Sequence, residues 1–339
     1  MSESMYSKAG VDIDKGNQAV NKIKEMVKNL GIREIGKFSG FFPLKQKIKN
    51  PVLVSSADGV GTKLKIAFMM EKHDTIGKDI VNHCVNDILV YGAKPLFFLD
   101  YIGMCKVDPD VVSDIVKGIL NACIENDFIL LGGETAEMPG FYNNKEYDLA
   151  GFIVGIVEGN KIIDSKKIKT GDLLIGLPST GLHTNGYSLA RHIVFEKLKL
   201  KVDSIVQGFS RTIGEELLET HRSYLKPVMN LIKNNLVKGI AHITGGGFID
   251  NIPRILPENK SAQIEKVWEI PQIFQFLIDS GKIDETERYR VFNMGIGMVL
   301  VVDKNDLTKV ENTLNSLNEK FYLIGQIIEN KNKNRVIIN

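Results

Sequence analysis

Apolar residues follow two periodicities along this chain, and the two alternate. Short, nearly continuous apolar runs predict buried strands, whereas longer segments with apolar residues at every third or fourth position predict amphipathic helices. Regular alternation of the two predicts an α/β fold. The expected strands are 51–56, 95–104, 128–133, 149–159, 173–178, 239–244, 295–302 and 321–329, and the expected helices are 16–30, 75–91, 109–126, 186–197, 227–235 and 306–317.

A polar stretch, NKIIDSKKIKTGD at 160–172, interrupts this alternation, and a similar order of elements restarts after it. We place a domain boundary near residue 168, with an N-terminal domain over 1–168 and a C-terminal α/β domain over 169–339. The N-terminal domain is expected to hold a mixed sheet of about four strands with helices. A chain of 339 residues with 43% hydrophobic content suits two such domains that share a cleft.

The charge balance narrows the range of partners. Lys and Arg total 43 against 41 Asp and Glu, and neither sign forms a long block, which argues against nucleic acid and anionic lipid as partners. We find no apolar signal segment and no apolar run long enough to span a membrane. The three cysteines are too far apart for C-x-x-C chemistry and fit a reducing compartment. We expect a cytoplasmic protein that binds small molecules or other protein surfaces.

The turn DGVGT follows the first expected strand of the N-terminal domain. Gly59 and Gly61 can open a tight turn whose backbone amides point outward, with Thr62 on the turn and Asp58 and Lys63 on either side. Such a turn suits a phosphate together with a metal ion. An ordinary strand-to-helix connection with surface charges explains the same residues equally well.

The helix expected over 75–91 carries a polar stripe. Asp79, His83 and Asp87 recur every four residues and share one face, with Asn82 and Asn86 beside them. A solvent-exposed face would explain this stripe. The alternative is that Asn86 and Asp87, near the C-terminal end of the helix, offer oxygen ligands to Mg²⁺. We interpret His83 as a hydrogen-bonded structural residue.

The stretch LLGGETAEMPG repeats the design of the first turn. A buried strand leads into Gly132 and Gly133, and Glu134 and Glu137 follow directly. Acids after a glycine pair at the carboxyl end of a strand point to the crevice where α/β sheets bind ligands. We therefore expect a functional role for this segment.

Two turns of the C-terminal domain also follow strands. In GLHTNGYSL, Asn185 is expected to cap the next helix, which accounts for Asn185 but leaves His183 unexplained. In HITGGGFIDNIPR, Gly245, Gly246 and Gly247 stand between a strand and a short helix. A bare backbone at a helix N-terminus is a natural phosphate site, and the alternative is a mere tight turn.

Taken together, several motifs make the chain resemble the AIR synthetases, the phosphoribosylformylglycinamidine cyclo-ligases of purine biosynthesis. The resemblance covers essentially the whole chain, in order. It implies a two-domain protomer that dimerises through its N-terminal sheets, with a cleft in which ATP and formylglycinamidine ribonucleotide (FGAM) meet. The motifs are KAGVDIDKGN, SSADGVGTKL, NHCVNDILVYGAKPLFFLDY, GGETAEMPGFY, YDLAGFIVG, GLHTNGYSL, HITGGGFIDNIPR and FNMGIGM.

The resemblance also implies roles for individual residues. The Mg-ATP side would include Asp58, Asn86, Asp87 and Glu134, with Asp58 and Asp87 as metal ligands, Gly59, Gly61 and Thr62 on the nucleotide turn, Lys63 near phosphate and Lys8 covering the nucleotide. His183 and Asn185 would lie on the catalytic turn, and Gly245, Gly246 and Gly247 would receive the ribose phosphate. Small departures from the family pattern occur at Ala57, Leu182 and Thr184 and leave the assignment intact.

The implied reaction is ATP-dependent ring closure of FGAM to 5-aminoimidazole ribonucleotide (AIR). The nearest alternatives are related enzymes that phosphorylate other oxygens or selenide. Selenophosphate synthetase-like proteins are expected to carry Cys or selenocysteine near the N-terminus, whereas the first Cys here is Cys84. A glutamine-using FGAM synthetase needs a nucleophilic Cys and a longer chain or a partner. A regulatory nucleotide-binding protein without turnover stays open, and a turnover assay separates it from an enzyme.

Overall fold

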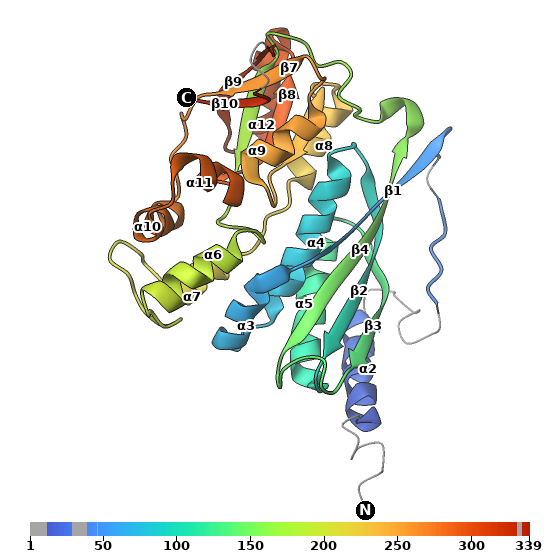
Figure 1. The fold of residues 1–339 in the computed structure, drawn as a ribbon. Coiled ribbons are helices and arrows are strands. Elements are labelled where there is room, and N and C mark those ends of the chain that lie inside the picture. Colours follow the sequence, from blue (N-terminus) through green and yellow to red (C-terminus); the bar gives the residue numbers. More distant parts are fainter. Residues whose placement is uncertain (1–11, 29–38, 46, 331–333) are drawn as a thin grey trace, which may run out of the picture.

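Two β-sheets, one in each half of the chain, form the framework of the molecule (Figure 1). The computed structural model describes residues 12–28, 39–45, 47–330 and 334–339. Lys8, expected near the nucleotide, lies outside the described residues. Within the described part of the chain, no helix is long and apolar enough to cross a membrane.

The N-terminal sheet has four strands in the order β1-β4-β2-β3. β2 and β3 run parallel, and the other neighbouring pairs are antiparallel, so the sheet is mixed as predicted. The strands are β1 (Pro51–Gly59), β2 (Lys94–Met104), β3 (Ile129–Glu137) and β4 (Tyr147–Glu158).

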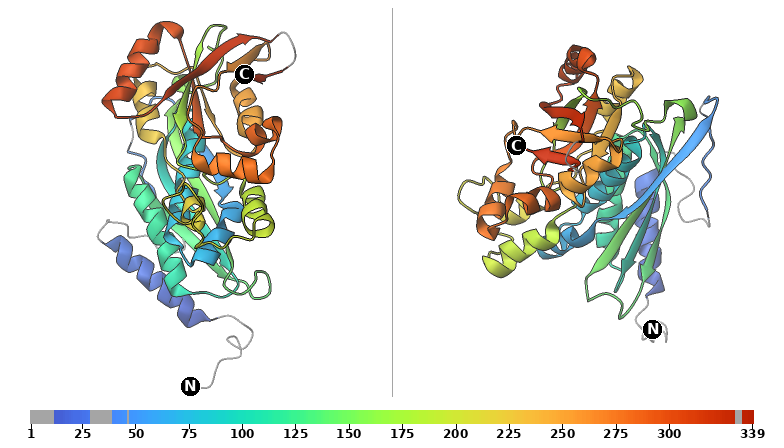
Figure 2. Two further views of the ribbon diagram at one scale, coloured as in Figure 1. Left: turned by 90° about the vertical axis from the view of Figure 1, so that its left-hand side faces the viewer. Right: turned by 45° about the horizontal axis from the view of Figure 1, so that its top comes forward.

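Helices cover one face of this sheet. α4 (Asp74–Leu89) packs on β1 and β4, α5 (Pro109–Glu125) packs beside α4, and α2 (Ile13–Val27) lies along α5 (Figure 2). The sequence fixes the start of α5, because the Asp108 side chain accepts hydrogen bonds from the first turn and Pro109 occupies the first helical position.

The opposite face of the N-terminal sheet carries apolar side chains that no helix of the described residues covers. Register places Ala57, Phe152 and Leu99 in one row across β1, β4 and β2, and Leu53 is on the same side of β1. Leu53 and Phe152 remain 58% and 44% exposed. The ring of Phe42, 5.3 Å from that of Phe97, covers only part of this face.

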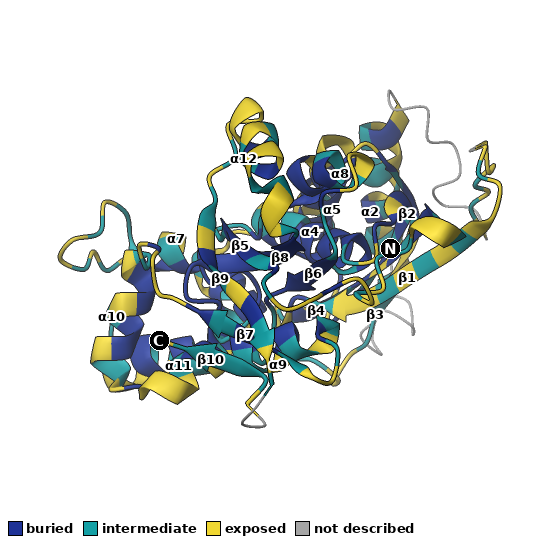
Figure 3. Cartoon of the chain, turned by 90° about the horizontal axis from the view of Figure 1, so that it is seen from above, coloured by how far each residue is buried: buried dark blue, intermediate teal, exposed yellow. Residues whose placement is uncertain are grey.

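The C-terminal sheet has six strands in the order β10-β7-β9-β5-β8-β6. Every residue of β8 is buried, so this strand lies in the core of the C-terminal half (Figure 3). The strands are β5 (Leu173–Pro178), β6 (Gly239–His242), β7 (Lys260–Ile264), β8 (Ile296–Val302), β9 (Tyr322–Glu329) and β10 (Val336–Ile338). Its longer helices are α8 (Leu225–Lys233), α10 (Gln272–Gly281) and α12 (Leu307–Ser316).

Most predicted elements are confirmed, but two expectations need correction. The helix expected over 186–197 is α6 (Tyr187–Arg191) followed by a π-helical segment over 192–197. Its N-cap is Gly186 in a left-handed conformation, with no side-chain cap, so Asn185 does not cap it. The short helix expected after the triple glycine is α9 (Gly247–Asn251). Sequence periodicity missed the other short elements, which are α3 (Leu64–Met70), α7 (Ile213–Leu217), α11 (Glu285–Val291), β7 and β10, as well as α10.

Candidate active site

The polar stripe of α4 is buried between the two halves of the chain and is not a solvent-exposed face. The Asp79 carboxylate accepts a hydrogen bond from the backbone N–H of His221 at 2.7 Å, and the Asn82 amide donates to the His221 carbonyl at 2.7 Å. The Asn86 amide donates to the Arg222 carbonyl at 2.9 Å and accepts from the Tyr224 N–H at 3.0 Å. These polar side chains therefore bind the extended segment that precedes α8.

This arrangement corrects the role expected for Asn86. Its side chain is fully buried, and both ends of its amide are occupied by backbone groups of the C-terminal half. The structure therefore does not support a nucleotide contact by Asn86. Its amide instead fixes α4 against the 221–224 segment.

Lys63 also differs from its expected place near phosphate. Its ammonium is buried, lies 2.8 Å from a carboxylate oxygen of Asp79, and donates to the carbonyls of His183 and Glu219 at 3.1 and 2.6 Å. With three acceptors around it and no exposed surface, the ammonium does not face the cleft. The structure therefore places Lys63 in an interdomain contact and does not support a catalytic contact to phosphate.

The next two positions of the stripe, His83 and Asp87, form a cluster with Asp58 of β1 and with His242 of the C-terminal half. Nε2 of His83 lies 2.7 Å from Oδ2 of Asp58 at the end of β1 and 3.8 Å from Oδ2 of Asp87. Nδ1 of His242, at the end of β6, lies 2.8 Å from Oδ1 of Asp87. The two predicted metal ligands, Asp58 and Asp87, therefore flank His83.

Electrostatics favour ionised carboxylates in this cluster. Burial opposes ionisation of Asp87, but the hydrogen bond and charge of His242 hold its pKa below the usual range. Burial likewise opposes ionisation of Asp58, and His83 holds the pKa of that carboxyl low. Burial lowers the basicity of His83, yet Asp58 and Asp87 raise its pKa above the usual value. For His242 burial prevails, and its pKa is lowered.

His183 is not on an open turn. The residue is fully buried in a left-handed backbone conformation, and its ring stacks on that of His221 with centroids 4.0 Å apart. Its Nε2 accepts from the Thr180 N–H at 3.3 Å, whereas its Nδ1 has no partner among the described residues. Burial together with nearby cations lowers its pKa well below the usual value. This placement does not support direct contact of His183 with substrate.

Asn185 and the glycine loop lie next to each other. A methyl group at Gly245 would meet only Oδ1 of Asn185, at 3.3 Å. Gly246 and Gly247 have positive φ, and a methyl group on Gly247 would approach the Tyr289 carbonyl oxygen to 2.1 Å. The backbone conformation therefore accounts for Gly246 and Gly247, whereas a methyl group on Gly245 would be in tight contact with the Asn185 side chain, which would have to shift slightly.

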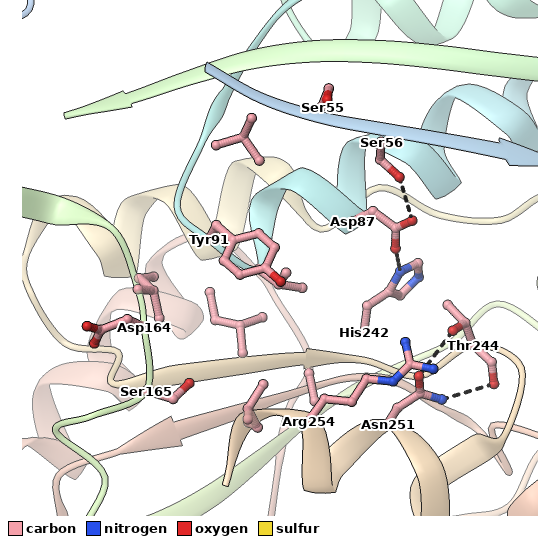
Figure 4. Close-up of a pocket in the computed structure, with 16 residues that line it drawn as sticks. Ser55, Ser56, Asp87, Tyr91, Asp164, Ser165, His242, Thr244, Asn251 and Arg254 are labelled. Carbon is pink, nitrogen blue, oxygen red and sulfur yellow. Dashed lines mark hydrogen bonds and ion pairs between the residues drawn. The ribbon is translucent and has the colours of Figure 1, made fainter. Parts of the chain in front are cut away.

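A cavity of about 320 Å³ lies between the two halves, beside this loop (Figure 4). β1 contributes Ser55 and Ser56, and Ser56 donates a hydrogen bond to Asp87 at 3.0 Å. His242 and Asp87 line the cavity together, and Arg254, from the short helix after α9, lines it on the side of Thr244 and Asn251. The cavity therefore brings Asp87 of the α4 stripe together with Thr244 and Asn251, which stand on either side of the glycine loop in the sequence.

Sequence reasoning gave no role to three residues of this region, which are Arg254, His221 and His242. Arg254 belongs to the motif GGGFIDNIPR but received no role, although an arginine that soon follows a glycine loop is itself a signal for phosphate. His221 carries no signal in the sequence, because only the fold brings it to His83, His183 and His242.

The structure does not bring Glu134 into this cluster. Register aligns Gly59, Ala150, Tyr101 and Glu134 across the four strands, so Glu134 lies three strand spacings, roughly 14 Å, from Gly59. Thr62 is exposed, and its hydroxyl lies 3.2 Å from that of Ser188. The turn from Gly59 to Thr62 thus remains next to Asp58, whereas Glu134 is at the far edge of the sheet.

Comparison with known proteins first defines the class. The family model "AIR synthase related protein, N-terminal domain" matches residues 46–157, and "AIR synthase related protein, C-terminal domain" matches residues 169–338. Solved structures share this fold at low identity. Escherichia coli HypE has a TM-score of 0.67 at 16% identity, with 95% of this chain and 93% of that chain covered. Thiamine-monophosphate kinase from Stenotrophomonas maltophilia has a TM-score of 0.66 at 14% identity, with 95% and 96% covered.

Curated relatives then define the family. The phosphoribosylformylglycinamidine cyclo-ligase of Geotalea uraniireducens is 52% identical over 335 residues, covering 96% of each chain. That of Alkaliphilus oremlandii is 51% identical over 330 residues, covering 96% of this chain and 97% of the relative. The chain belongs to the phosphoribosylformylglycinamidine cyclo-ligase family, a family of enzymes, which confirms the resemblance drawn from the sequence and its predicted fold class.

Proposed function

We propose that this chain catalyses the ATP-dependent closure of FGAM to AIR, with release of ADP and phosphate, in de novo purine biosynthesis. The observation that carries the proposal is 52% identity to a curated phosphoribosylformylglycinamidine cyclo-ligase over 96% of the chain. The interdomain cavity, lined by Asp87, His242, Thr244 and Arg254, supports it because a ring closure between two bound ligands needs a shared cleft.

The chemistry requires positioned charge more than a covalent nucleophile. The formyl amide oxygen of FGAM attacks the γ-phosphorus of ATP, ADP leaves, and an imidate phosphate forms. The amidine nitrogen then attacks the activated carbon and loses a proton, and phosphate leaves with the former formyl oxygen. Both steps depend on stabilising charge at phosphoryl oxygens, which the carboxylate-imidazole cluster, through a bound cation, and Arg254 can supply.

We place the substrate phosphate at the glycine-loop end of the cavity. Arg254 makes no ion pair with the described residues, although it lines the cavity beside Thr244 and Asn251. Gly245 has no side chain and lies next to Asn185, so a phosphate oxygen could approach its backbone. A guanidinium and a bare backbone are a common combination for binding phosphate. Gly246 and Gly247 shape the loop that presents this backbone.

We place the nucleotide and its cation at the opposite end. Asp58 and Asp87 are suitably placed to hold a divalent cation, which ATP would bring as Mg²⁺. Gly59, Gly61 and Thr62 follow Asp58 directly and are proposed to contact the nucleotide. We do not propose that Glu134 contacts the nucleotide bound by its own protomer, because Glu134 lies three strands away from Gly59 across the sheet.

We further propose that the protein is a cytoplasmic homodimer. The uncovered apolar face of the N-terminal sheet supports dimer formation, since exposed contiguous apolar surface of this kind marks an interface. The identical face of a second copy would cover it symmetrically.

The decisive experiment is a turnover assay on the purified protein. With ATP, a divalent cation and FGAM, we expect equimolar ADP, phosphate and a diazotisable aminoimidazole. FGAM labelled with ¹⁸O in its formyl group should pass the label to phosphate and not to ADP. ADP release that is independent of FGAM and yields no aminoimidazole would instead identify a nucleotide hydrolase or a regulatory protein.

A further inference from the structure

The short helical turn after α9, Ile252–Ile255, carries Arg254 to the cavity. Within the described residues, the Arg254 side chain makes no hydrogen bond or ion pair. The position of its guanidinium therefore depends on the turn from which it extends. Whatever fixes this turn also fixes the place of the guanidinium relative to the glycine loop.

Asn251 joins the N-terminal end of the turn to the glycine loop. Its side chain is buried, and its amide donates to the carbonyl oxygens of Gly245 and Gly247 at 3.1 and 2.8 Å. The same amide lies 3.3 Å from the carbonyl oxygen of Thr244. Since Asn251 directly precedes the turn, the loop and the turn form one unit.

Arg335 holds the C-terminal end of the turn. Its Nη2 donates to the carbonyl oxygens of Leu256 and Pro257 at 2.7 and 3.1 Å. Its Nε donates to the carbonyl oxygen of Lys260 at 3.1 Å, and Nη2 also lies 3.5 Å from that of Pro253, the residue before Arg254. Carbonyls at the end of a helical turn lack partners within it, and an arginine supplies them with strong, charge-assisted hydrogen bonds.

The edge of the C-terminal sheet fixes Arg335 itself. β10 pairs in parallel with β7, and the N–H of Ala262 donates to the Arg335 carbonyl at 2.9 Å. The buried Ser261 hydroxyl donates to the Asn334 carbonyl at 2.6 Å. Arg335 does not belong to the described residues that line the cavity, so it can act on the cavity only through the turn that carries Arg254.

From these contacts we propose that Arg335 is a positioning residue for the phosphate of FGAM. It holds the 252–257 turn from outside the cleft, so that the Arg254 guanidinium stays beside the backbone of the glycine loop. Misplacing a contact by about 1 Å can cost up to about 100-fold in rate or affinity, so a residue remote from the substrate can control its binding. The inference rests on the proposed function, because it takes Arg254 as the ligand of the substrate phosphate.

Arg335→Gln tests the proposal in the full-length protein. The KM for FGAM should rise at least about threefold, and by no more than in Arg254→Gln, whereas the KM for ATP should stay constant. Arg335→Lys keeps the charge but cannot reach several carbonyls at once, so its KM should lie between those of the wild type and Arg335→Gln. Lys197→Gln is the matched control, because Lys197 likewise donates to a carbonyl at the end of a helix, that of Gly281 on α10, outside the cavity.

Coupling to Arg254 distinguishes positioning from a merely structural role. In a protein that already carries Arg254→Gln, adding Arg335→Gln should change the KM for FGAM by less than about twofold, because the contact that Arg335 positions is gone. A structural role predicts instead that the two effects multiply. Full multiplication in the double variant, or an unchanged KM in folded Arg335→Gln, would overturn the proposal. If Arg335→Gln does not fold, Arg335→Lys carries the same comparison.

Ribose 5-phosphate separates this inference from the proposed function, since it offers a phosphate monoester without the groups that react. Calorimetry should show weaker binding to Arg254→Gln and Arg335→Gln than to the wild type and Lys197→Gln. That result without any conversion of FGAM would support the positioning role and remove the cyclo-ligase activity. Conversion of FGAM with equal KM in the wild type and Arg335→Gln would support the activity and overturn the positioning role.

Discussion

The ammonium of Lys63 lies 2.8 Å from Oδ2 of Asp79, and neither side chain has any exposed surface. Lys63 precedes α3 and Asp79 lies on α4, while the carbonyls that complete the lysine's shell belong to His183 and Glu219 of the C-terminal half. Burial lowers the pKa of Lys63 and raises the pKa of Asp79, so each group depends on the other for its charge. The charged state of this buried ion pair therefore depends on the packing of the two halves of the chain against each other.

Removing one partner of this pair should destabilise the protein more than removing both. Lys63→Met leaves Asp79 as an unpaired buried carboxylate, which should cost about 3–5 kcal/mol of the free energy of unfolding. Adding Asp79→Asn removes that charge and keeps an acceptor for the His221 N–H, so the double variant should recover part of the loss. Urea unfolding at pH 7 measures all three proteins. A double variant less stable than Lys63→Met would contradict this account.

Asp100 should make stability depend on pH. Burial between the N-terminal sheet and its helices raises the pKa of this carboxyl to about 7. Because the folded state holds the proton more tightly than the unfolded state, the free energy of unfolding should fall as pH rises from about 4 to 7. The penalty above pH 7 is at most about 4 kcal/mol.

Asp100→Asn removes this ionisation while keeping the shape of the side chain. The variant should match the wild type in stability near pH 4 and exceed it increasingly up to pH 7, beyond which the difference should stay constant. Denaturant titrations at several pH values provide the measurement. A stability difference that does not change between pH 4 and 7 would show that Asp100 ionises normally in the folded protein.

Gly245 and Gly246 should respond differently to alanine. Gly245 has an ordinary backbone angle, and a methyl group there would press only on Oδ1 of Asn185, at 3.3 Å. Gly245→Ala should therefore fold with a small shift of the Asn185 side chain, and it should raise the KM for FGAM at least about tenfold by obstructing a charged hydrogen bond. The KM for ATP should stay constant. Gly16→Ala, on α2 with free space around it, is the matched control and should change neither KM.

Gly246→Ala tests the backbone instead. At φ +91 a methyl group would lie 2.5 Å from Cβ of Asp250, so this variant should lose stability as well as FGAM affinity. Thermal unfolding separates the two effects. If Gly245→Ala raises the KM for ATP and leaves that for FGAM unchanged, the proposed placement is reversed, and ATP binds at the glycine-loop end of the cavity.

The α4 stripe shows how far the sequence can lead. Its spacing predicted that Asp79, His83 and Asp87 share one face, and they do. Whether that face meets water or protein is not encoded locally, because it depends on the 221–224 segment more than 130 residues away along the chain. For this reason the sequence led us to expect Asn86 as a ligand of Mg²⁺, whereas in the structure its side-chain amide forms hydrogen bonds with backbone groups of Arg222 and Tyr224.

The glycines of the sequence also predicted only part of the local structure. The pair Gly132 and Gly133, with acids after it, was interpreted as the end of a strand at a ligand crevice, but a methyl group at Gly133 would lie 2.2 Å from Oδ1 of Asp100 on the neighbouring strand. Gly133 thus makes room for a buried side chain of the protein itself. A sequence marks the place where a side chain is not tolerated, and only the fold tells what occupies the space.

Arg254 should decide the affinity for the substrate phosphate. Arg254→Gln removes the positive charge at the glycine-loop end of the cavity, so the KM for FGAM should rise at least about tenfold through loss of a charged hydrogen bond. The KM for ATP and the unfolding midpoint should change little. Arg290→Gln is the control, since Arg290 is exposed and bound to Asp250 outside the cavity. Equal effects of both variants would argue against a specific phosphate contact.

The uncovered face of the N-terminal sheet should set the oligomeric state. Phe152 lies in the middle of that face and is 44% exposed, so burial of its remaining exposed surface against a second copy would contribute about 1 kcal/mol per side. Phe152→Asp removes this contribution and adds a charge, and it should convert a dimer into a folded monomer in sedimentation velocity at micromolar concentration. Ile205→Asp is the control, because Ile205 is a strongly exposed apolar residue of the C-terminal half that lies far from this sheet in sequence and should leave the mass unchanged. If folded Phe152→Asp keeps the mass of the wild type, or the wild type is already a monomer, the interface lies elsewhere or does not form.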